Sequence, residues 1–236
     1  MLAPCFFILI CSCLTSAAPG VKDQGLNMYI DMVLANVQII MMESGFDPAT
    51  LPNITVHFGK NDSGVAGLED GWMNGISNLY RSADMDFLNE DGILSGMKGG
   101  IGLGALEGHY DCIAHALFGE RLLADVLISN SGGEIEFAAK LNHQTCHFEI
   151  DKFNLKHIGK FHVDIHGLGI LNWIAEIVAS STIAVVKPFV VGIIEVSVKS
   201  IMNQVFGLIE LGPLGPVFGC EVQPTTTNYL NVPRKF

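Results

Sequence analysis

Basic side chains are scarce in this sequence. It carries 13 Lys and Arg residues against 24 Asp and Glu residues, a formal net charge of −11, and no stretch gathers the basic residues into a cluster. Proteins that bind nucleic acid or anionic membrane surfaces usually present a basic patch, because phosphates attract Lys and Arg. We therefore expect no nucleic-acid partner.

Catalytic motifs are also missing. The sequence has no nucleophile elbow, and its closest nucleophile–base pair, Cys112 and His115, has opposite strand parity, so the two side chains would point to opposite faces. Residues 100–105 match the GxGxxA form of a dinucleotide fingerprint, which needs a helix after the turn. The residues that follow alternate like a strand instead. We expect neither an enzyme nor a cofactor.

Metal-ligand patterns are weak. His162, Asp164 and His166 share one face if their segment is a strand, and His143 and His147 share a face in either secondary structure. Imidazole and carboxylate groups can bind zinc. Three polar residues in alternation are more often the solvated side of a strand, so the sequence predicts no metal site.

The first 18 residues have the pattern of a secretory signal. An apolar run from Phe6 to Ile10 is followed by the small residues Thr15-Ser16-Ala17-Ala18, although no Lys or Arg precedes the run. The sequence therefore predicts a signal peptide over residues 1–18 and a secreted, extracellular protein.

Few cysteines would remain in the mature chain. The signal contains three of the six, which leaves Cys112, Cys146 and Cys220 in an oxidising compartment. Three cysteines allow one bridge and one leftover thiol. Cys112 and Cys146 lie in strand-like segments, whereas Cys220 lies in a Pro/Gly-rich tail, so we predict a Cys112–Cys146 disulfide.

The longest apolar stretch runs from Gly167 to Leu211. It lacks the wide polar face of a surface helix, so it is either wrapped by protein or placed in lipid. A central Lys187 would cost about 2.5–3.5 kcal/mol in a membrane span. We predict a buried helix and no integral membrane span. Pro188 predicts two helical pieces, one ending near Val186 and one starting at Pro188; a single gently kinked helix is the alternative.

The first helix and the loop after it can also be predicted. Apolar residues recur every three or four positions from Leu26 to Ser44, which predicts a helix that stops at Gly45. The following loop contains two glycosylation sequons, at Asn53 and Asn61. Both asparagines are predicted glycosylation sites.

The middle of the chain, from Gly75 to His166, has a period of two. The parity slips near Lys152, as a bulge would make it do. No helix long enough for a crossover interrupts the pattern, which favours seven or eight antiparallel strands. The predicted fold is α+β: one domain over residues 19–211, in which a strongly curved sheet wraps the C-terminal helix, followed by a Gly/Pro/Thr-rich tail over residues 212–236.

Loose apolar patterns carry a family resemblance. They comprise Phe46-Asp47-Pro48, Leu51-Pro52, Phe148-Glu149-Ile150 through Phe153, Ile158-Gly159, Gly167-Leu168, Ile170-Leu171 and Trp173-Ile174. With these the chain resembles the group 7 mite allergen family, which is similar to arthropod juvenile-hormone-binding and takeout-type proteins and to lipid-binding proteins of the bactericidal/permeability-increasing type. The resemblance implies a rolled antiparallel sheet around a long C-terminal helix, with an apolar cavity. It transfers no ligand residues.

The functional prediction is a secreted, non-enzymatic carrier of an apolar small molecule or lipid, held between the sheet and the long helix. Trp173, Ile177, Phe189 and Ile193 are the predicted apolar wall, because they are large side chains on that helix. The alternative is an innate-immunity-like or surface protein that recognises microbial lipids through exposed loops. The sequence makes no prediction of the oligomeric state.

Overall fold

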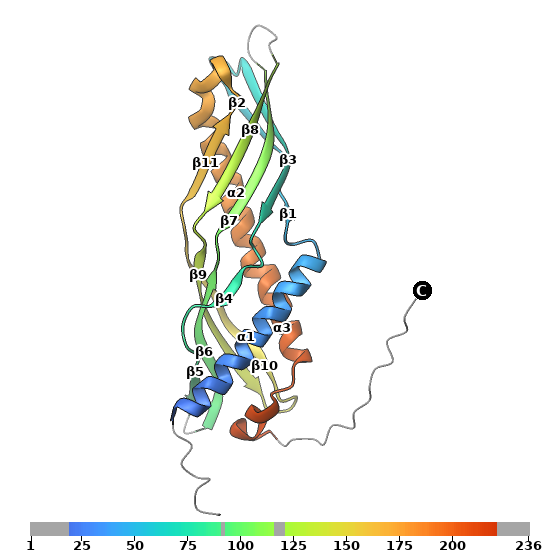
Figure 1. The fold of residues 1–236 in the computed structure, drawn as a ribbon, viewed down its shortest axis with the longest axis vertical. Coiled ribbons are helices and arrows are strands. Elements are labelled where there is room, and N and C mark those ends of the chain that lie inside the picture. Colours follow the sequence, from blue (N-terminus) through green and yellow to red (C-terminus); the bar gives the residue numbers. More distant parts are fainter. Residues whose placement is uncertain (1–18, 91–92, 116–120, 221–236) are drawn as a thin grey trace, which may run out of the picture.

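The computed structural model describes residues 19–90, 93–115 and 121–220. The predicted signal peptide, Cys5, Cys11 and Cys13 lie outside these residues. Figure 1 shows an elongated molecule in which the long C-terminal helical stretch runs along both sheets and the first helix crosses it. The α+β class and the order of helix, curved antiparallel sheet and long helix are as predicted.

The first helix, α1 (Pro19–Glu43), ends as its sequence indicates. Gly45 follows it with φ +74°, a left-handed conformation that glycine adopts without steric cost. One face of α1 is buried on the rest of the protein, and its buried apolar side chains are Leu26, Tyr29, Ile30, Val33, Leu34, Val37 and Met41. The opposite face leaves Met28, Met32, Ile39 and Met42 exposed.

The strands form two antiparallel sheets. Sheet A has the order β1-β3-β7-β8-β11, with β2 paired to β3. Its strands are β1 (Ala49–Thr50), β2 (Ile54–Phe58), β3 (Gly64–Asn74), β7 (Leu106–His115), β8 (Arg121–Asn130) and β11 (Phe161–His166). Sheet B has the order β10-β9-β6-β4, with β5 paired to β6. Its strands are β4 (Leu79–Arg81), β5 (Asp86–Glu90), β6 (Ile93–Leu103), β9 (Gly133–Asn142) and β10 (His147–Ile158).

Two-residue breaks connect the sheets. The chain passes from β6 to β7, from β8 to β9 and from β10 to β11 through such breaks, and each contains a glycine. Gly132 has φ +91°, and a Cβ there would collide with the carbonyl oxygens of Leu103 and Gly104. The buried Asn130 side chain joins two breaks, donating to Gly159 O at 2.7 Å and accepting from Gly132 N at 2.7 Å. Each break divides one long strand in two: β6 and β7, β8 and β9, and β10 and β11 are the halves. If each pair is counted as one long strand, the eleven strands become eight.

The bulge predicted near Lys152 is confirmed. In the β9–β10 pair the register shifts between Ile150 and Lys152, and it shifts again between Leu155 and His157. The fingerprint-like glycines of residues 100–104 lie at the end of β6, and the strand β7 follows them instead of a helix. Residues 93–115 therefore form strand–turn–strand, whereas the dinucleotide fingerprint needs strand–turn–helix at this position.

The C-terminal helical stretch begins with η1 (Gly169–Ile174) and continues through α2 (Ala175–Gly192), a π-helical segment η2 (Ile193–Val198) and α3 (Lys199–Leu208). The two-piece prediction at Pro188 is wrong, because Pro188 lies inside α2. Pro188 and Ala184, four residues earlier, are both exposed. Pro188 has no N–H to donate to the Ala184 carbonyl, but water can reach this exposed position and donate instead, so the helix continues.

Two stretches have the length and hydropathy of a membrane span, Gln24–Glu43 and Asn172–Leu208. Core helices of soluble proteins pass the same test. Here α2 packs on β11 and β2, and α3 packs on β10 and α1. In the most apolar window of the second stretch 28% is buried, and the large exposed apolar side chains of that stretch are Trp173, Ile177, Val196 and Leu208.

The disulfide prediction is wrong. Cys146 pairs with Cys220, with a Cα–Cα distance of 5.9 Å, and Cys112 is a buried free thiol. Cys112 faces the core from β7, whereas Cys146 lies in the turn between β9 and β10. Burial raises the pKa of the Cys112 thiol and keeps it protonated.

The boundary predicted at residue 211 also needs correction. The segment η3 (Gly212–Phe218) follows α3 and packs on α1 and β6, with Leu214, Phe218 and Cys220 buried. The folded part therefore includes at least nine residues of the predicted tail, and the remainder, residues 221–236, lies outside the described part of the chain.

Candidate ligand-binding groove

A cluster of aromatic side chains packs where α1, α3, sheet B and η3 meet, at the lower end of the molecule in Figure 1. Phe206 of α3 stacks with Tyr29 at 6.2 Å and Phe137 at 6.1 Å, and its ring meets the edge of Phe148 at 6.0 Å. Phe218 of η3 extends the cluster through Phe148 at 5.2 Å. Offset and edge-to-face pairs of this kind add to the stabilisation that burial itself provides.

Polar contacts fix α1 on the edge of sheet B. Arg81 donates to both Asp31 oxygens, at 3.0 and 3.3 Å, and to Asp84 at 2.8 Å. The Asn27 side chain donates to Asp84 at 3.0 Å and accepts from the Met85 backbone N–H at 2.8 Å. These contacts determine where the exposed methionines of α1 lie.

The disulfide bond fixes the position of η3. Cys220 lies two residues after the end of η3. Its disulfide bond to Cys146 links η3 to the turn between β9 and β10. Phe218 is held by Phe87 at 5.4 Å as well as by Phe148. The segment therefore has a defined position relative to α1.

Between α1 and η3 lies an apolar groove of about 340 Å³. Seven residues line it: Gly25, Met28, Tyr29, Met32, Glu210, Leu211 and Leu214. A Cβ at Gly25 would lie 3.3 Å from Leu214 Cδ2, so the small residue allows η3 to approach the helix. Met28 is 72% exposed and Met32 is 45% exposed, which places both on an open rim. The volume is within the range of small-molecule sites.

Two polar groups border the groove. The Tyr29 hydroxyl donates to the carbonyl oxygen of Ile209 at 3.4 Å, and burial raises the pKa of Tyr29 above its usual range. Tyr29 is therefore neutral at physiological pH. Glu210 is exposed and contributes the only acidic side chain of the lining. A ligand with an anionic head would meet an unfavourable charge at this rim.

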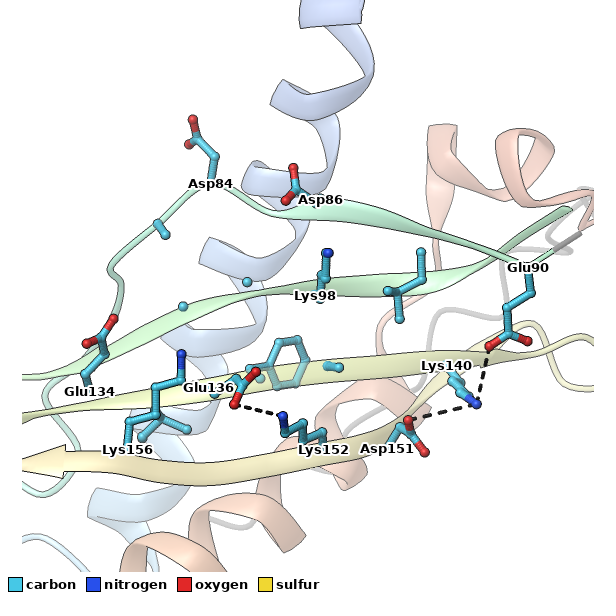
Figure 2. A pocket seen from close by; sticks show the side chains of 17 residues that line it. Asp84, Asp86, Glu90, Lys98, Glu134, Glu136, Lys140, Asp151, Lys152 and Lys156 are labelled. Carbon is cyan, nitrogen blue, oxygen red and sulfur yellow. Dashed lines mark ion pairs between the residues drawn. The ribbon is translucent and has the colours of Figure 1, made fainter. Parts of the chain in front are cut away.

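A second hollow of about 590 Å³ lies on the outer face of sheet B (Figure 2). Ten of its lining side chains are charged; Asp84 precedes β5, and the other nine lie on β5, β6, β9 and β10. Lys152 pairs with Glu136 at 2.8 Å, which holds the pKa of that carboxyl below its usual range, and Lys140 pairs with Glu90 at 3.5 Å. This hollow is a charge-compensated surface and does not suit an apolar ligand.

The structure does not bring the four predicted wall residues together. Trp173 is 58% exposed and meets the edge of Phe58 at 5.6 Å, and Ile177 is 39% exposed. Phe189 and Ile193 are half-buried against the core. Trp173 and Phe189 are separated by sixteen positions, roughly 24 Å along a helix. None of the four lines the groove between α1 and η3.

The predicted glycosylation sites and the candidate catalytic and metal-binding residues lie as follows. Asn53 and Asn61 are both exposed, on either side of β2, and their glycosylation stays a prediction. Cys112 and His115 point to opposite faces of β7, as their parity predicts. His162, Asp164 and His166 all lie on the exposed face of β11.

The sequence pattern does not reveal the groove, because its two sides come from residues 25–32 and 210–214, which lie far apart in the chain. The exposed methionine stripe of α1 was one usable signal, since Met28 lies outside the buried face of that helix. The second side comes from residues 210–214, which adjoin the segment expected to be a tail.

Comparisons with known proteins identify a matching family and a shared fold. The sequence model described as Group 7 allergen matches residues 25–206. No curated protein sequence matches.

Several solved structures are similar, and two of them are described here. The crystal structure of lipopolysaccharide binding protein matches with a TM-score of 0.52 and 14% identity, over 77% of this chain and 38% of that one. Takeout 1 of Epiphyas postvittana matches with a TM-score of 0.36 and 10% identity, over 82% of this chain and 94% of that one. The chain thus spans well under half of the lipopolysaccharide binding protein, and the likeness to it shows a shared fold.

Proposed function

This chain belongs to the group 7 allergen family, and from that membership and its apolar groove we propose that it is a secreted protein that binds an apolar small molecule or lipid. The binding site in this proposal is the groove between α1 and η3. No catalytic step is part of it.

The exposed methionines at the rim of the groove carry the proposal. The side chains of Met28 and Met32 are exposed to solvent, next to the buried Tyr29, Leu211 and Leu214. Removing a Met side chain from water is worth about 1.5–3 kcal/mol. Methionine also adapts its shape to irregular partners, so one groove can accept ligands of varied outline.

The lining indicates a neutral ligand. A chain of about ten methylenes would gain roughly 8 kcal/mol on burial, at about 0.8 kcal/mol for each methylene. Association costs of about 4 kcal/mol or more leave a weak-to-moderate site, suited to carrying a ligand and releasing it. Glu210 at the rim and the net charge of −11 both oppose an anionic head group.

Recognition of microbial lipids through exposed loops receives less support. Within the described ranges, every large exposed apolar side chain lies in a helix or a strand. The similar lipopolysaccharide binding protein shares the fold at 14% identity, which does not extend to its ligand.

A dye titration tests the groove. We expect N-phenyl-1-naphthylamine, a neutral apolar probe, to gain fluorescence with the wild-type protein, and we expect a Met28→Gln/Met32→Gln variant to bind it about tenfold more weakly, a loss of about 1.4 kcal/mol. The matched control is Ile39→Gln/Met42→Gln, which adds the same polarity to α1 at similar exposure but outside the groove. Equal weakening in both variants would contradict the site.

The negative charge of Glu210 can be tested in the same dye assay, by measuring how well neutral and anionic ligands displace the dye. A neutral long-chain alcohol should displace the dye more readily than the fatty-acid anion of the same length. In Glu210→Gln this preference should shrink, because the repulsion at the rim is gone. If wild type prefers the anion, the proposed ligand class is wrong.

A further inference from the structure

The outer face of sheet A carries carboxylates and histidines in register. Across β3, β7, β8 and β11 one row reads Glu69, Asp111, Asp125 and His166. All four side chains are exposed. Asp111 and Asp125 are direct cross-strand partners, a position where two like charges destabilise the pair.

His109 lies between these two carboxylates. Its Nε2 is 3.5 Å from Asp125 Oδ1 and 3.8 Å from Asp111 Oδ1. One ligand atom from each of the three residues lies within 4.8 Å of the others. The imidazole stacks on Trp72 at 6.1 Å with an interplanar angle of 26°, and only 22% of the His109 side chain is exposed. The ring is therefore held in place beside the two oxygens.

Cationic side chains do not balance these carboxylates. Among the described residues, the ion pairs of Asp111 and Asp125 involve only His109. The neighbouring outward-facing side chains are carboxylates and imidazoles, not Lys or Arg: Glu69, Glu107, Asp164, His162 and His166. The outer face of sheet B contrasts with this, because Lys140 and Lys152 lie among its carboxylates (Figure 2). A bound cation would neutralise the carboxylates of sheet A, as Lys140 and Lys152 neutralise those of sheet B.

We propose that His109, Asp111 and Asp125 form a binding site for a divalent transition-metal ion of the zinc class. One imidazole nitrogen and two carboxylate oxygens match the ligands that zinc takes, whereas calcium and magnesium prefer oxygen alone. His166 is the cross-strand neighbour of Asp125, and a change in its side-chain rotamer can supply a fourth donor. The site lies on sheet A and is separate from the apolar groove.

Calorimetric titration of the untagged full chain, after treatment with a chelator, tests the site. ZnCl₂ should bind with one site per chain, and CaCl₂ and MgCl₂ should give no comparable heat. Asp125→Asn and His109→Gln should each weaken zinc binding by about tenfold or more, since each removes one ligand. His57→Gln is the matched control, because His57 is exposed on β2 of the same sheet and outside the cluster.

Circular dichroism of each variant confirms that it folds, so that lost binding reports the ligand. Zinc that does not bind, or that binds equally to wild type, Asp125→Asn and His109→Gln, would overturn the proposal. An equal loss in His57→Gln would do the same. Unchanged affinity in His166→Gln would remove His166 from the ligand set.

Discussion

Replacing Phe206 with alanine is expected to destabilise the protein by about 3–5 kcal/mol. Phe206 is fully buried and contacts aromatic rings from α1, β9 and β10: Tyr29, Phe137 and Phe148. Its removal leaves a cavity where the long helix, the first helix and sheet B meet. Urea unfolding followed by circular dichroism measures the loss.

The matched control for this change is Leu208→Ala. Leu208 lies two residues further along α3 and is 76% exposed, so its truncation should change the free energy of unfolding by less than about 0.5 kcal/mol. A Phe206→Ala variant as stable as Leu208→Ala would show that the aromatic cluster does not hold this end of the fold together.

Removing the disulfide should have an effect of similar size. The bond joins residues 74 positions apart, for which the chain-entropy model gives about 4.5 kcal/mol. Cys146→Ser should lose this stability and should also weaken dye binding, because Cys220 anchors the segment that contributes Leu214 to the groove. Unfolding and dye titration are both measured with and without reductant.

Cys112→Ala provides the control for the pairing. Its buried thiol is outside the disulfide, so reductant should still destabilise this variant as it destabilises wild type. If Cys112→Ala abolishes the response to reductant and Cys220→Ser does not, the pairing is Cys112–Cys146, as the sequence alone suggested.

Local patterns predicted the local features of this fold. The apolar period of α1 and the glycine after it depend on a few neighbouring residues, as does the parity slip at Lys152, and the structure has each of these features. The fold class followed from the same patterns, because an uninterrupted period of two excludes a crossover helix.

Contacts between distant residues could not be read from those patterns. Parity indicated that Cys112 faces one side of its strand, but it could not show that this side is the core or that Cys146 sits at a turn. Cys220 reaches that turn only because η3 folds back across the aromatic cluster. The helix continues through Pro188 because the lost hydrogen bond falls on an exposed face, which the sequence does not reveal.

The groove was missed for the same reason. The sequence placed the ligand wall on the large apolar residues of the long helix, and these point in different directions along its length. Met28 and Leu214 become neighbours only when residues 25–32 and 210–214 meet. The apolar ligand class followed from composition and resemblance, whereas the location of the site required the structure.

Methyl NMR of protein labelled with ¹³C at the methionine methyl groups tests the central claim most directly. When the aromatic dye N-phenyl-1-naphthylamine binds, its ring current should shift the methyl signals of Met28 and Met32. Met42 is 49% exposed on the same helix but outside the groove, so its signal should stay in place. Unchanged Met28 and Met32 signals at saturating dye would contradict a ligand site between α1 and η3.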